Sequence, residues 1–281
     1  MLKPITKGFL NEQIKQFLLH LGIIIGALIM FFPIFWLISL SLQPSSEIYS
    51  AALNIIPKQI TFENYIIGWV RSDFSKYFGN SLIIALGVAV LSVVINSMAG
   101  FALAKYNFPG KNIIFIIVLS AMILPIQVTM VPLYLLVVKL GWVNTFLGVI
   151  IPTVGQTFGV FLMRQYCLSI PEELIEAAKI DGCSDFRIYW QIIIPLCKAA
   201  LAVNFIFQFM WRWNDLLWPL IVLREQKLYT IQQALAFFRD DFTVSGGPIM
   251  AMSIVSMIPI VIIFFALQKY FIQGIARTGL K

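Results

Sequence analysis

Residues 169–195 read SIPEELIEAAKIDGCSDFRIYWQIIIP and are the most informative polar segment of the chain. Ser169 and Glu172 have the spacing of a capping box, and Pro171 suits a first helical turn, so a helix is predicted to start here. Gly182 is placed to end that helix with a left-handed residue. Long apolar stretches lie on both sides, so we expect the segment to be a helical loop between two membrane spans.

Two short helices are expected within this loop. The first has a predicted face made of Leu174, Ala177 and Ala178, and its small alanines would let another surface approach closely. The second begins at Ser184 as its cap. Three aromatic residues and an isoleucine at helical spacing make up one face of it: Phe186, Tyr189, Trp190 and Ile193. An exposed surface of this kind indicates a partner protein.

The composition of the whole chain excludes an ordinary soluble protein. Its 281 residues are 60% hydrophobic and only 12% charged, whereas a soluble domain is about 45–50% apolar and about 25% charged. Disordered, disulfide-rich and coiled-coil classes fail on the same figures. At about 20 apolar residues per crossing, the chain can hold several spans, and each must be helical because lipid cannot satisfy open backbone groups. We therefore predict an all-α integral membrane protein.

Gaps between charged residues locate six predicted transmembrane helices. Five uncharged runs can each cross about 30 Å of hydrocarbon as a helix. The sixth is equally apolar but contains Arg212 and Asp215. The predicted spans are residues 17–42, 80–104, 113–137, 145–164, 199–222 and 248–270. Prolines such as Pro125 occur in most of them, which indicates either kinks beside a pathway or ordinary bundle packing.

The distribution of basic residues predicts the orientation. Six spans place both termini on one side, and if that side is cytoplasmic the inner segments carry twelve Lys and Arg and the outer segments seven. The net charge of +7 is then an orientation signal at a membrane and not a sign of nucleic-acid binding. Cys167, Cys183 and Cys197 fall in the cytoplasmic loop, where thiols stay reduced, and without a CxxC pair they predict neither a metal nor a redox site.

The loop resembles the EAA motif of the permeases of ATP-binding cassette (ABC) importers. That motif reads EAA, three residues, Gly, nine residues, Ile, any residue, Leu, Pro, and here Ile194 replaces the leucine. The resemblance implies a type I ABC importer permease fold, with residues 1–281 as a single transmembrane permease domain and 169–195 as the cytoplasmic coupling loop. Its ATPase-coupling residues would be Glu176, Ala177, Ala178 and Gly182. The alternative, an amphipathic helix lying on the membrane surface, stays open.

Further similarity narrows the resemblance to the carbohydrate-type permeases of the maltose-transporter kind. It includes Leu124-Pro125 with Gln127 in the third span, and Trp213-Asn214-Asp215 in the fifth. The resemblance implies a non-catalytic subunit in the plasma (inner) membrane that imports a sugar or oligosaccharide. Its partners would be a second, different permease subunit, two ATPase subunits and an extracytoplasmic solute-binding protein.

The fifth span carries a polar stripe. Asn204, Gln208, Arg212 and Asp215 follow i, i+4, i+8 and i+11, within an arc of about 80°. A charge at mid-membrane costs at least ~2.5–3.5 kcal/mol, so Arg212 and Asp215 should face protein or water, and their spacing allows them to pair. One interpretation makes these residues a wall of the translocation pathway, together with Trp211 and Gln127. For Arg212 and Asp215 a structural ion pair is an equal alternative.

The motifs that are missing assign ATP hydrolysis to another chain. The sequence contains no GxxxxGK[ST] phosphate-binding loop, no HExxH or GxSxG motif and only one histidine. We therefore predict no catalytic residue, no metal site and no cofactor bound by this chain, while ATP and Mg²⁺ are used by the partner ATPase. The alternative function, a stand-alone six-span secondary transporter or channel, should show repeated halves and several intramembrane carboxylates, whereas Asp215 is the one candidate.

Overall fold

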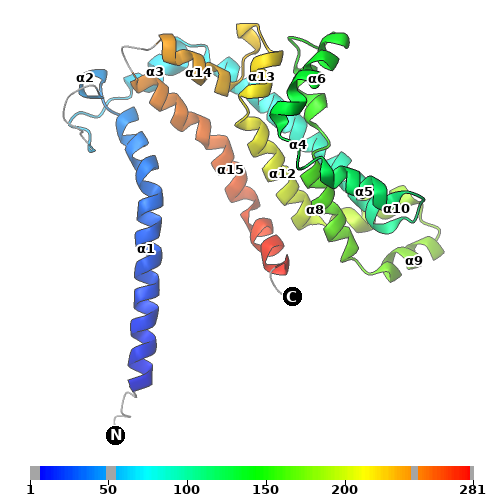
Figure 1. Cartoon of the computed structure of the whole chain (residues 1–281). Helices are drawn as coiled ribbons and strands as arrows, with labels where there is room; N and C mark the ends of the chain where they lie inside the picture. Colours follow the sequence, from blue (N-terminus) through cyan, green and yellow to red (C-terminus); the bar gives the residue numbers. More distant parts are fainter. Residues whose placement is uncertain (1–6, 49–54, 242–245, 279–281) are drawn as a thin grey trace. The chain divides into compact units, whose positions relative to one another are not determined.

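The computed structural model describes residues 7–48, 55–241 and 246–278, and these residues form helices and no β-strand, which confirms the all-α class (Figure 1). The helices are α1 (Lys7–Ser41), α2 (Ser45–Ile48), α3 (Glu63–Val70), α4 (Phe74–Lys105), α5 (Lys111–Ser120), α6 (Ile126–Lys139), α7 (Phe146–Ile150), η1 (Ile151–Thr153), α8 (Thr157–Leu168), α9 (Glu172–Ile180), α10 (Asp185–Ile188), η2 (Tyr189–Ile193), α11 (Ile194–Leu196), α12 (Lys198–Trp213), α13 (Leu217–Val222), η3 (Gln226–Leu228), α14 (Ile231–Asp241) and α15 (Gly247–Thr278).

The chain divides into two compact units, and the smaller comprises Met1–Ser72 and Phe238–Val255. Its anchor is Asn64 of α3, whose side-chain amide donates to the carbonyl oxygens of Ser41 at 2.9 Å and of Gln43 at 2.7 Å. These bonds satisfy one carbonyl at the last residue of α1 and one just beyond it, where no helical partner remains. Gly68 of the same helix leaves room for Met252, because an added Cβ would collide with that side chain.

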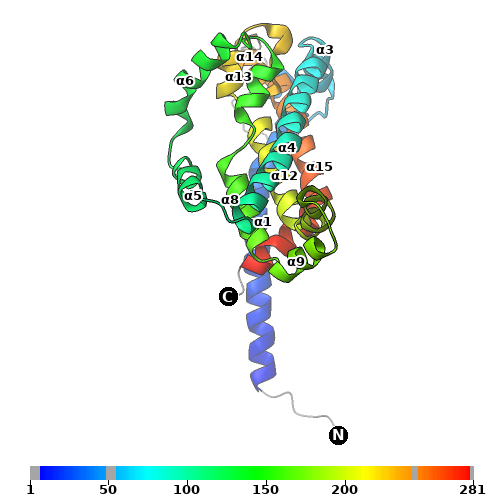
Figure 2. The ribbon, with the colours of Figure 1, turned by 90° about the vertical axis from the view of Figure 1, so that its right-hand side faces the viewer.

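The larger unit, Asp73–Phe237 with Ser256–Lys281, is built on the contact of α4, α8 and α12. These three helices run alongside one another in both ribbon views (Figure 1 and Figure 2). Two glycines let α4 and α8 approach closely: a Cβ on Gly100 would collide with Met163, and one on Gly159 with the Asn96 side chain. At one end of the bundle a buried cluster joins α4 to α6, α7 and α13, and at the other end a second cluster joins α4 to α8, α9 and η2.

Within the described residues, three helical stretches are long and apolar enough to cross a membrane: Glu12–Ser41, Phe74–Lys105 and Gly247–Tyr270. Two bent pairs raise that number to five if each pair is one span: Phe146–Thr153 with Thr157–Leu168, bent by 42°, and Asp185–Leu196 with Lys198–Trp213, bent by 82°. The count of six spans therefore stays a prediction.

The run predicted as one helix at 113–137 is two helices in the structure. α5 ends at Ser120 and α6 begins at Ile126, after Pro125 in an extended conformation. Proline has no amide N–H to donate, and it disfavours the helical conformation of the preceding residue, here Leu124. The proline in this run thus interrupts the helix instead of kinking it.

The run predicted at 199–222 is also divided. α12 ends at Trp213, and α13 begins at Leu217. The break is held by side chains, because Asn214 Nδ2 donates back to the Met210 carbonyl at 3.0 Å and Asp215 Oδ1 accepts from the Trp218 amide at 3.4 Å. The Asp215 side chain therefore accepts from the first turn of α13, and the residue itself lies between the two helices.

Candidate functional site

The end of helix α9 has the geometry predicted for it. Gly182 has a φ of +76°, in the left-handed region that glycine adopts without steric cost. Its amide donates to the Lys179 carbonyl at 3.0 Å, and the Cys183 amide donates to the Ala178 carbonyl at 2.9 Å. Ser184 then caps α10, accepting from the Arg187 amide at 3.4 Å. Both the stop at Gly182 and the cap at Ser184 are confirmed.

The predicted capping box at the start of α9 is wrong. Ser169 Oγ donates to the Tyr166 carbonyl at 2.8 Å and so completes the end of α8, while Pro171 precedes α9 without a side-chain cap. The Glu172 carboxylate is used elsewhere, in an ion pair 3.1 Å from Lys105 Nζ. The sequence spacing was right for a capping box, but both side chains have other partners.

Lys105, the last residue of α4, holds the start of the coupling loop. Its ammonium donates to the Ile170 carbonyl at 2.6 Å and to Glu172 Oε2 at 3.1 Å, and its side chain is 5% exposed. Next to it, the Tyr106 ring lies 5.4 Å from Lys179 Nζ of α9. Burial, with a further contribution from the charge of Asp185, raises the pKa of the Tyr106 phenol above its ordinary value, so the group stays neutral. These contacts of Lys105 and Tyr106 with the loop could not be predicted from the sequence, because the residues lie far apart in the chain.

Helix α9 turns one face inward and one outward, and the division differs from the predicted one. Ile175 and Ala178 are buried in the cluster around Met163 and Ile188, whereas Leu174 is 46% exposed. Of the three residues of the predicted face, Leu174 and Ala177 are therefore exposed, whereas Ala178 is buried in the core. The outward side carries the remaining residues of the helix, among them Glu173, Leu174, Glu176, Ala177 and Ile180.

The aromatic residues that follow are divided in the same way. Tyr189 is buried, and its hydroxyl lies 2.6 Å from Ser97 Oγ of α4, a partner that permits burial of the phenol. Phe186 and Trp190 stay exposed, with ring centroids 6.1 Å apart. Trp190 lies within a π-helical turn at Tyr189–Ile193, which precedes α11 and α12. The predicted single face of four residues is thus half core and half outer surface.

Cys167 and Cys197 lie at the two ends of the coupling segment and are close together. Their Sγ atoms are 3.9 Å apart, and both side chains are buried. Cys167 closes the last turn of α8, and Cys197 immediately precedes α12. The sequence did not indicate this pairing, because thirty positions separate the two residues and no CxxC motif marks them.

The polar stripe of the fifth predicted span is mostly buried within the larger unit. Asn204 and Gln208 of α12 have no exposed surface, and Asn204 Oδ1 accepts from Asn96 Nδ2 of α4 at 3.4 Å. Several buried polar atoms have no hydrogen-bond partner within the described part of the chain: Ser92 Oγ, Asn96 Oδ1, Asn204 Nδ2 and both amide atoms of Gln208. Sequence periodicity alone did not show that α4 supplies half of this polar cluster.

Arg212 and Asp215 form the expected ion pair. The distance between Arg212 Nη1 and Asp215 Oδ2 is 2.8 Å, with side chains 6% and 13% exposed. Trp211 instead points outward at 40% exposure and packs against Phe207. Gln127 is exposed in the first turn of α6, and no hydrogen bond joins it to α12 in the described chain. Four of the six predicted pathway residues, those of the polar stripe, are therefore largely buried, whereas Trp211 and Gln127 are exposed.

Comparison with known proteins places these features in a family. The family described as "Binding-protein-dependent transport system inner membrane component" matches residues 93–277. The arabinooligosaccharides transport system permease protein AraQ of Halalkalibacterium halodurans is 38% identical, over 96% of this chain and 98% of that protein. The sn-glycerol-3-phosphate transport system permease protein UgpE of Brucella abortus is 31% identical, over 95% and 98%.

A solved structure is similar along nearly its whole length. It is a chain of a bacterial ABC transporter involved in the import of the acidic polysaccharide alginate, with a TM-score of 0.80 and 26% identity, covering 93% of this chain and 98% of that one. The family match covers well over half of the chain, and the relatives are similar from end to end. The chain therefore belongs to the binding-protein-dependent transport system inner membrane components, the multi-pass permease subunits of ABC importers.

Proposed function

We propose that the chain is the permease subunit of an ABC importer that moves a sugar or oligosaccharide into the cytoplasm, driven by ATP hydrolysis in a separate subunit. Helix α9 is the observation that carries this proposal. One side of it packs into the bundle through Ile175 and Ala178, and the other side presents Glu176 and Ala177 outward beside Gly182. A short helix fixed in this way can receive a docking ATPase and pass its movement inward. Ala178 contributes to this coupling indirectly, because its buried side chain packs α9 against the bundle.

The arrangement of the larger unit supports the proposed orientation. α9 and α13 lie at opposite ends of the α4–α8–α12 bundle in both ribbon views (Figure 1 and Figure 2). With α9 in the cytoplasm, the segment after α13 faces the outside, where a solute-binding protein would deliver substrate. We propose six spans with both termini in the cytoplasm, in a complex with a second permease subunit of different sequence and two ATPase subunits that use ATP and Mg²⁺.

The relatives indicate which substrates to test first. The names of the AraQ proteins refer to arabino-oligosaccharides, and the name of UgpE refers to glycerol-3-phosphate. The structural relative is described as involved in the import of alginate. We propose a sugar or oligosaccharide for this chain because the two AraQ proteins are the more similar in sequence, at 38% and 40% identity.

The function is tested by uptake into proteoliposomes. The tagged full-length chain is purified with the ATPase and permease that accompany it, and it is reconstituted with the solute-binding protein of the same system. We expect uptake of one member of a panel of arabino-, malto- and alginate oligosaccharides, raffinose and glycerol-3-phosphate when ATP is present on the ATPase side. A non-hydrolysable nucleotide should give no uptake. Uptake by the chain alone, driven by an ion gradient, would instead establish the stand-alone transporter.

We further propose that the buried polar cluster opens onto the translocation pathway when α4 and α12 separate. Burial of both amide atoms of Gln208 without a hydrogen bond is costly, at about 1–3 kcal/mol for each unsatisfied group. Separation of α4 and α12 would let water or sugar hydroxyls form hydrogen bonds with these atoms. Packing would then stabilise the state in which the two helices are in contact, and hydration would stabilise the separated state. Asn204, Gln208, Arg212 and Asp215 would then line the pathway, with Trp211 and Gln127 contributing from their exposed positions.

Cysteine labelling tests this opening. In a variant whose three cysteines are replaced by alanine, Gln208→Cys should react with a water-soluble maleimide in one transport state and be protected in the other. The matched control is Ala200→Cys, also on α12 and without exposed surface, but inside the apolar cluster; it should stay unlabelled in both states. If Gln208→Cys is unlabelled in the resting and the nucleotide-trapped complex alike, the cluster is a permanent part of the core.

A further inference from the structure

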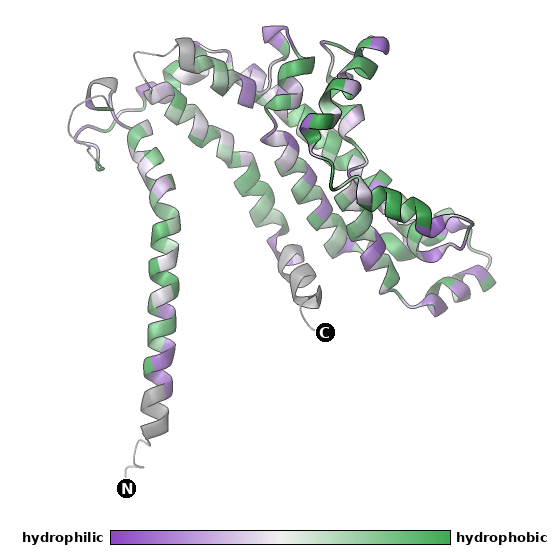
Figure 3. Ribbon diagram, in the orientation of Figure 1, coloured by the Kyte–Doolittle hydropathy of each residue, from purple (hydrophilic) through white to green (hydrophobic). Residues whose placement is uncertain are grey.

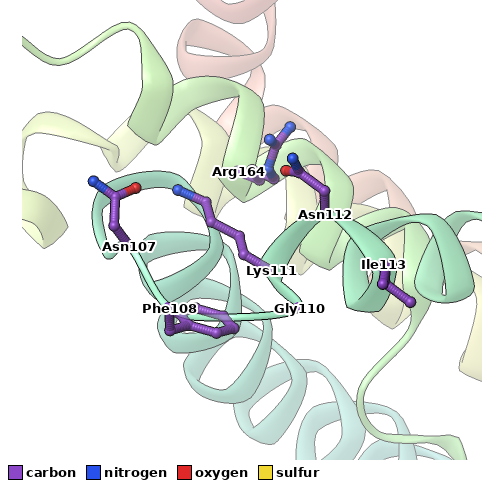
Figure 4. A pocket seen from close by; sticks show the side chains of 7 residues that line it. All are labelled: Asn107, Phe108, Gly110, Lys111, Asn112, Ile113 and Arg164. Carbon is purple, nitrogen blue, oxygen red and sulfur yellow. The ribbon is translucent and has the colours of Figure 1, made fainter.

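A cationic pocket lies at the corner between α4 and α5. It has a volume of about 440 Å³ and opens to the surface. Two basic and two amide side chains line it together with apolar residues and a glycine: Asn107, Phe108, Gly110, Lys111, Asn112, Ile113 and Arg164. Figure 4 shows the Lys111, Asn112 and Arg164 side chains around this space, with Arg164 contributed by α8. No acidic residue is among those lining it.

Both cations of the pocket are fixed in place by neutral partners. Lys111 Nζ donates to the Ala104 carbonyl at 3.2 Å, and Arg164 Nε donates to the Leu103 carbonyl at 3.2 Å. The Arg164 guanidinium also lies 3.9 Å from the centroid of the Phe115 ring. Neither cation has an ion pair with a carboxylate in the described part of the chain. The remaining N–H donors of both side chains are therefore available for an anion, since no carboxylate of the described residues pairs with them.

The surface next to the pocket is apolar. α5 starts at Lys111, and it has no buried residue. The isoleucines of its outward surface are between 46% and 65% exposed: Ile113, Ile114, Ile116 and Ile117. Figure 3 shows this helix as hydrophobic along its length, directly after the polar corner. The pocket thus combines a place for an anionic group with an adjoining surface for hydrocarbon.

We propose that this pocket binds the phosphate of an anionic glycerophospholipid, whose acyl chains lie along α5. Phosphate oxygens suit the remaining donors of Arg164 and Lys111, and the positive end of the α5 dipole adds to the attraction. Basic pockets at the cytoplasmic boundary of membrane helices are suited to acidic headgroups. The choice of leaflet rests on the orientation proposed above, whereas the binding itself does not depend on the transported substrate.

A lipid bound in this pocket would affect the coupling loop through the residues of α4 and α8 that contact the pocket and the loop. Arg164 of the pocket is hydrogen-bonded to the Leu103 carbonyl near the end of α4. Lys105, the last residue of α4, is hydrogen-bonded to the Ile170 carbonyl in the loop that leads to α9. A bound phosphate would neutralise the two cations and hold α4, α5 and α8 together at this corner. We therefore expect anionic lipid to stabilise the chain against thermal unfolding more than a neutral lipid of the same acyl chains.

Native mass spectrometry of the purified full-length chain tests the proposal. Phosphatidylglycerol and phosphatidylcholine with identical acyl chains are added separately, and bound lipid is counted. We expect one phosphatidylglycerol to be retained preferentially. Since a cation near an anionic headgroup contributes roughly 1 kcal/mol, or about a fivefold change in affinity, Lys111→Gln should weaken retention about fivefold and Lys111→Gln with Arg164→Gln about 25-fold.

Three comparisons make the result decisive. Lys139→Gln, which removes an exposed positive charge at the far end of α6, should leave retention unchanged. Lys111→Gln should keep the lipid-free thermal midpoint, which separates loss of binding from loss of folding. Inorganic phosphate at millimolar concentration should not displace the lipid. Equal retention of both lipids, equal loss in Lys139→Gln, or displacement of the lipid by phosphate alone would overturn the proposal.

Discussion

Gly182→Val is expected to stop the ATPase from co-purifying with the chain and to lower ATP-driven uptake at least tenfold. The residue stands at a φ of +76°, and no atom lies within 4 Å of an added Cβ, so the effect comes from backbone conformation and not from a clash. A left-handed conformation costs a non-glycine residue about 1–2 kcal/mol, and more with β-branching. The loop would relax, and the bonds from Gly182 and Cys183 back to α9 would be lost.

Two controls separate this effect from general instability. Gly141, after α6, has a φ of +69° and the same open space, so Gly141→Val carries the same strain away from the coupling loop. It should lower stability without removing the ATPase. Gly182→Asn should retain most of the coupling, because asparagine tolerates the left-handed region. If Gly182→Val co-purifies with the ATPase at the level of the unmodified chain, α9 is not the docking element.

Asp215→Asn is expected to lower the free energy of unfolding by about 3–5 kcal/mol, because it leaves the Arg212 guanidinium buried without its counter-charge. Asparagine keeps an oxygen for the Trp218 amide, so the start of α13 should survive and only the charge is removed. The drop should be visible as a lower thermal midpoint of the purified protein. An unchanged midpoint would show that the ion pair is hydrated and contributes little.

The double variant Arg212→Gln with Asp215→Asn distinguishes the two roles open to this pair. Removing both charges should restore most of the lost stability, since no unpaired charge remains. If the pair lines the pathway as proposed, ATP-driven uptake by this stable variant should still be reduced at least tenfold. Uptake at the normal rate would assign the pair to holding α12 and α13 in place.

The local features of the coupling loop could be predicted from sequence because they depend on backbone rules. Gly182 ends α9 because glycine adopts the left-handed conformation without steric cost. Ser184 caps α10 because its side chain reaches the amide of the residue three positions later. The capping box failed because Ser169 had an earlier helix to complete. Spacing identifies candidate partners, but it does not decide between two partners that compete for one side chain.

Features that depend on contacts between helices could not be predicted in this way. Lys105 appeared in the sequence only as a positive charge near the cytoplasm, whereas the structure buries it as a hydrogen-bond donor to a carbonyl 65 positions later. Asn204 and Gln208 were correctly placed on one face of a helix. What that face meets, Asn96 of α4, depends on the packing that Gly159 permits.

The proximity of Cys167 and Cys197 has a mechanical consequence. Because the Sγ atoms at the two ends of the coupling segment are 3.9 Å apart, the segment leaves the bundle and returns to it at a single place. If α9 receives the ATPase as proposed above, a force on it would reach the end of α8 and the start of α12 at this one place. A small rotation of α9 would then be expected to tilt both helices together, with Lys105 as a further contact to α4.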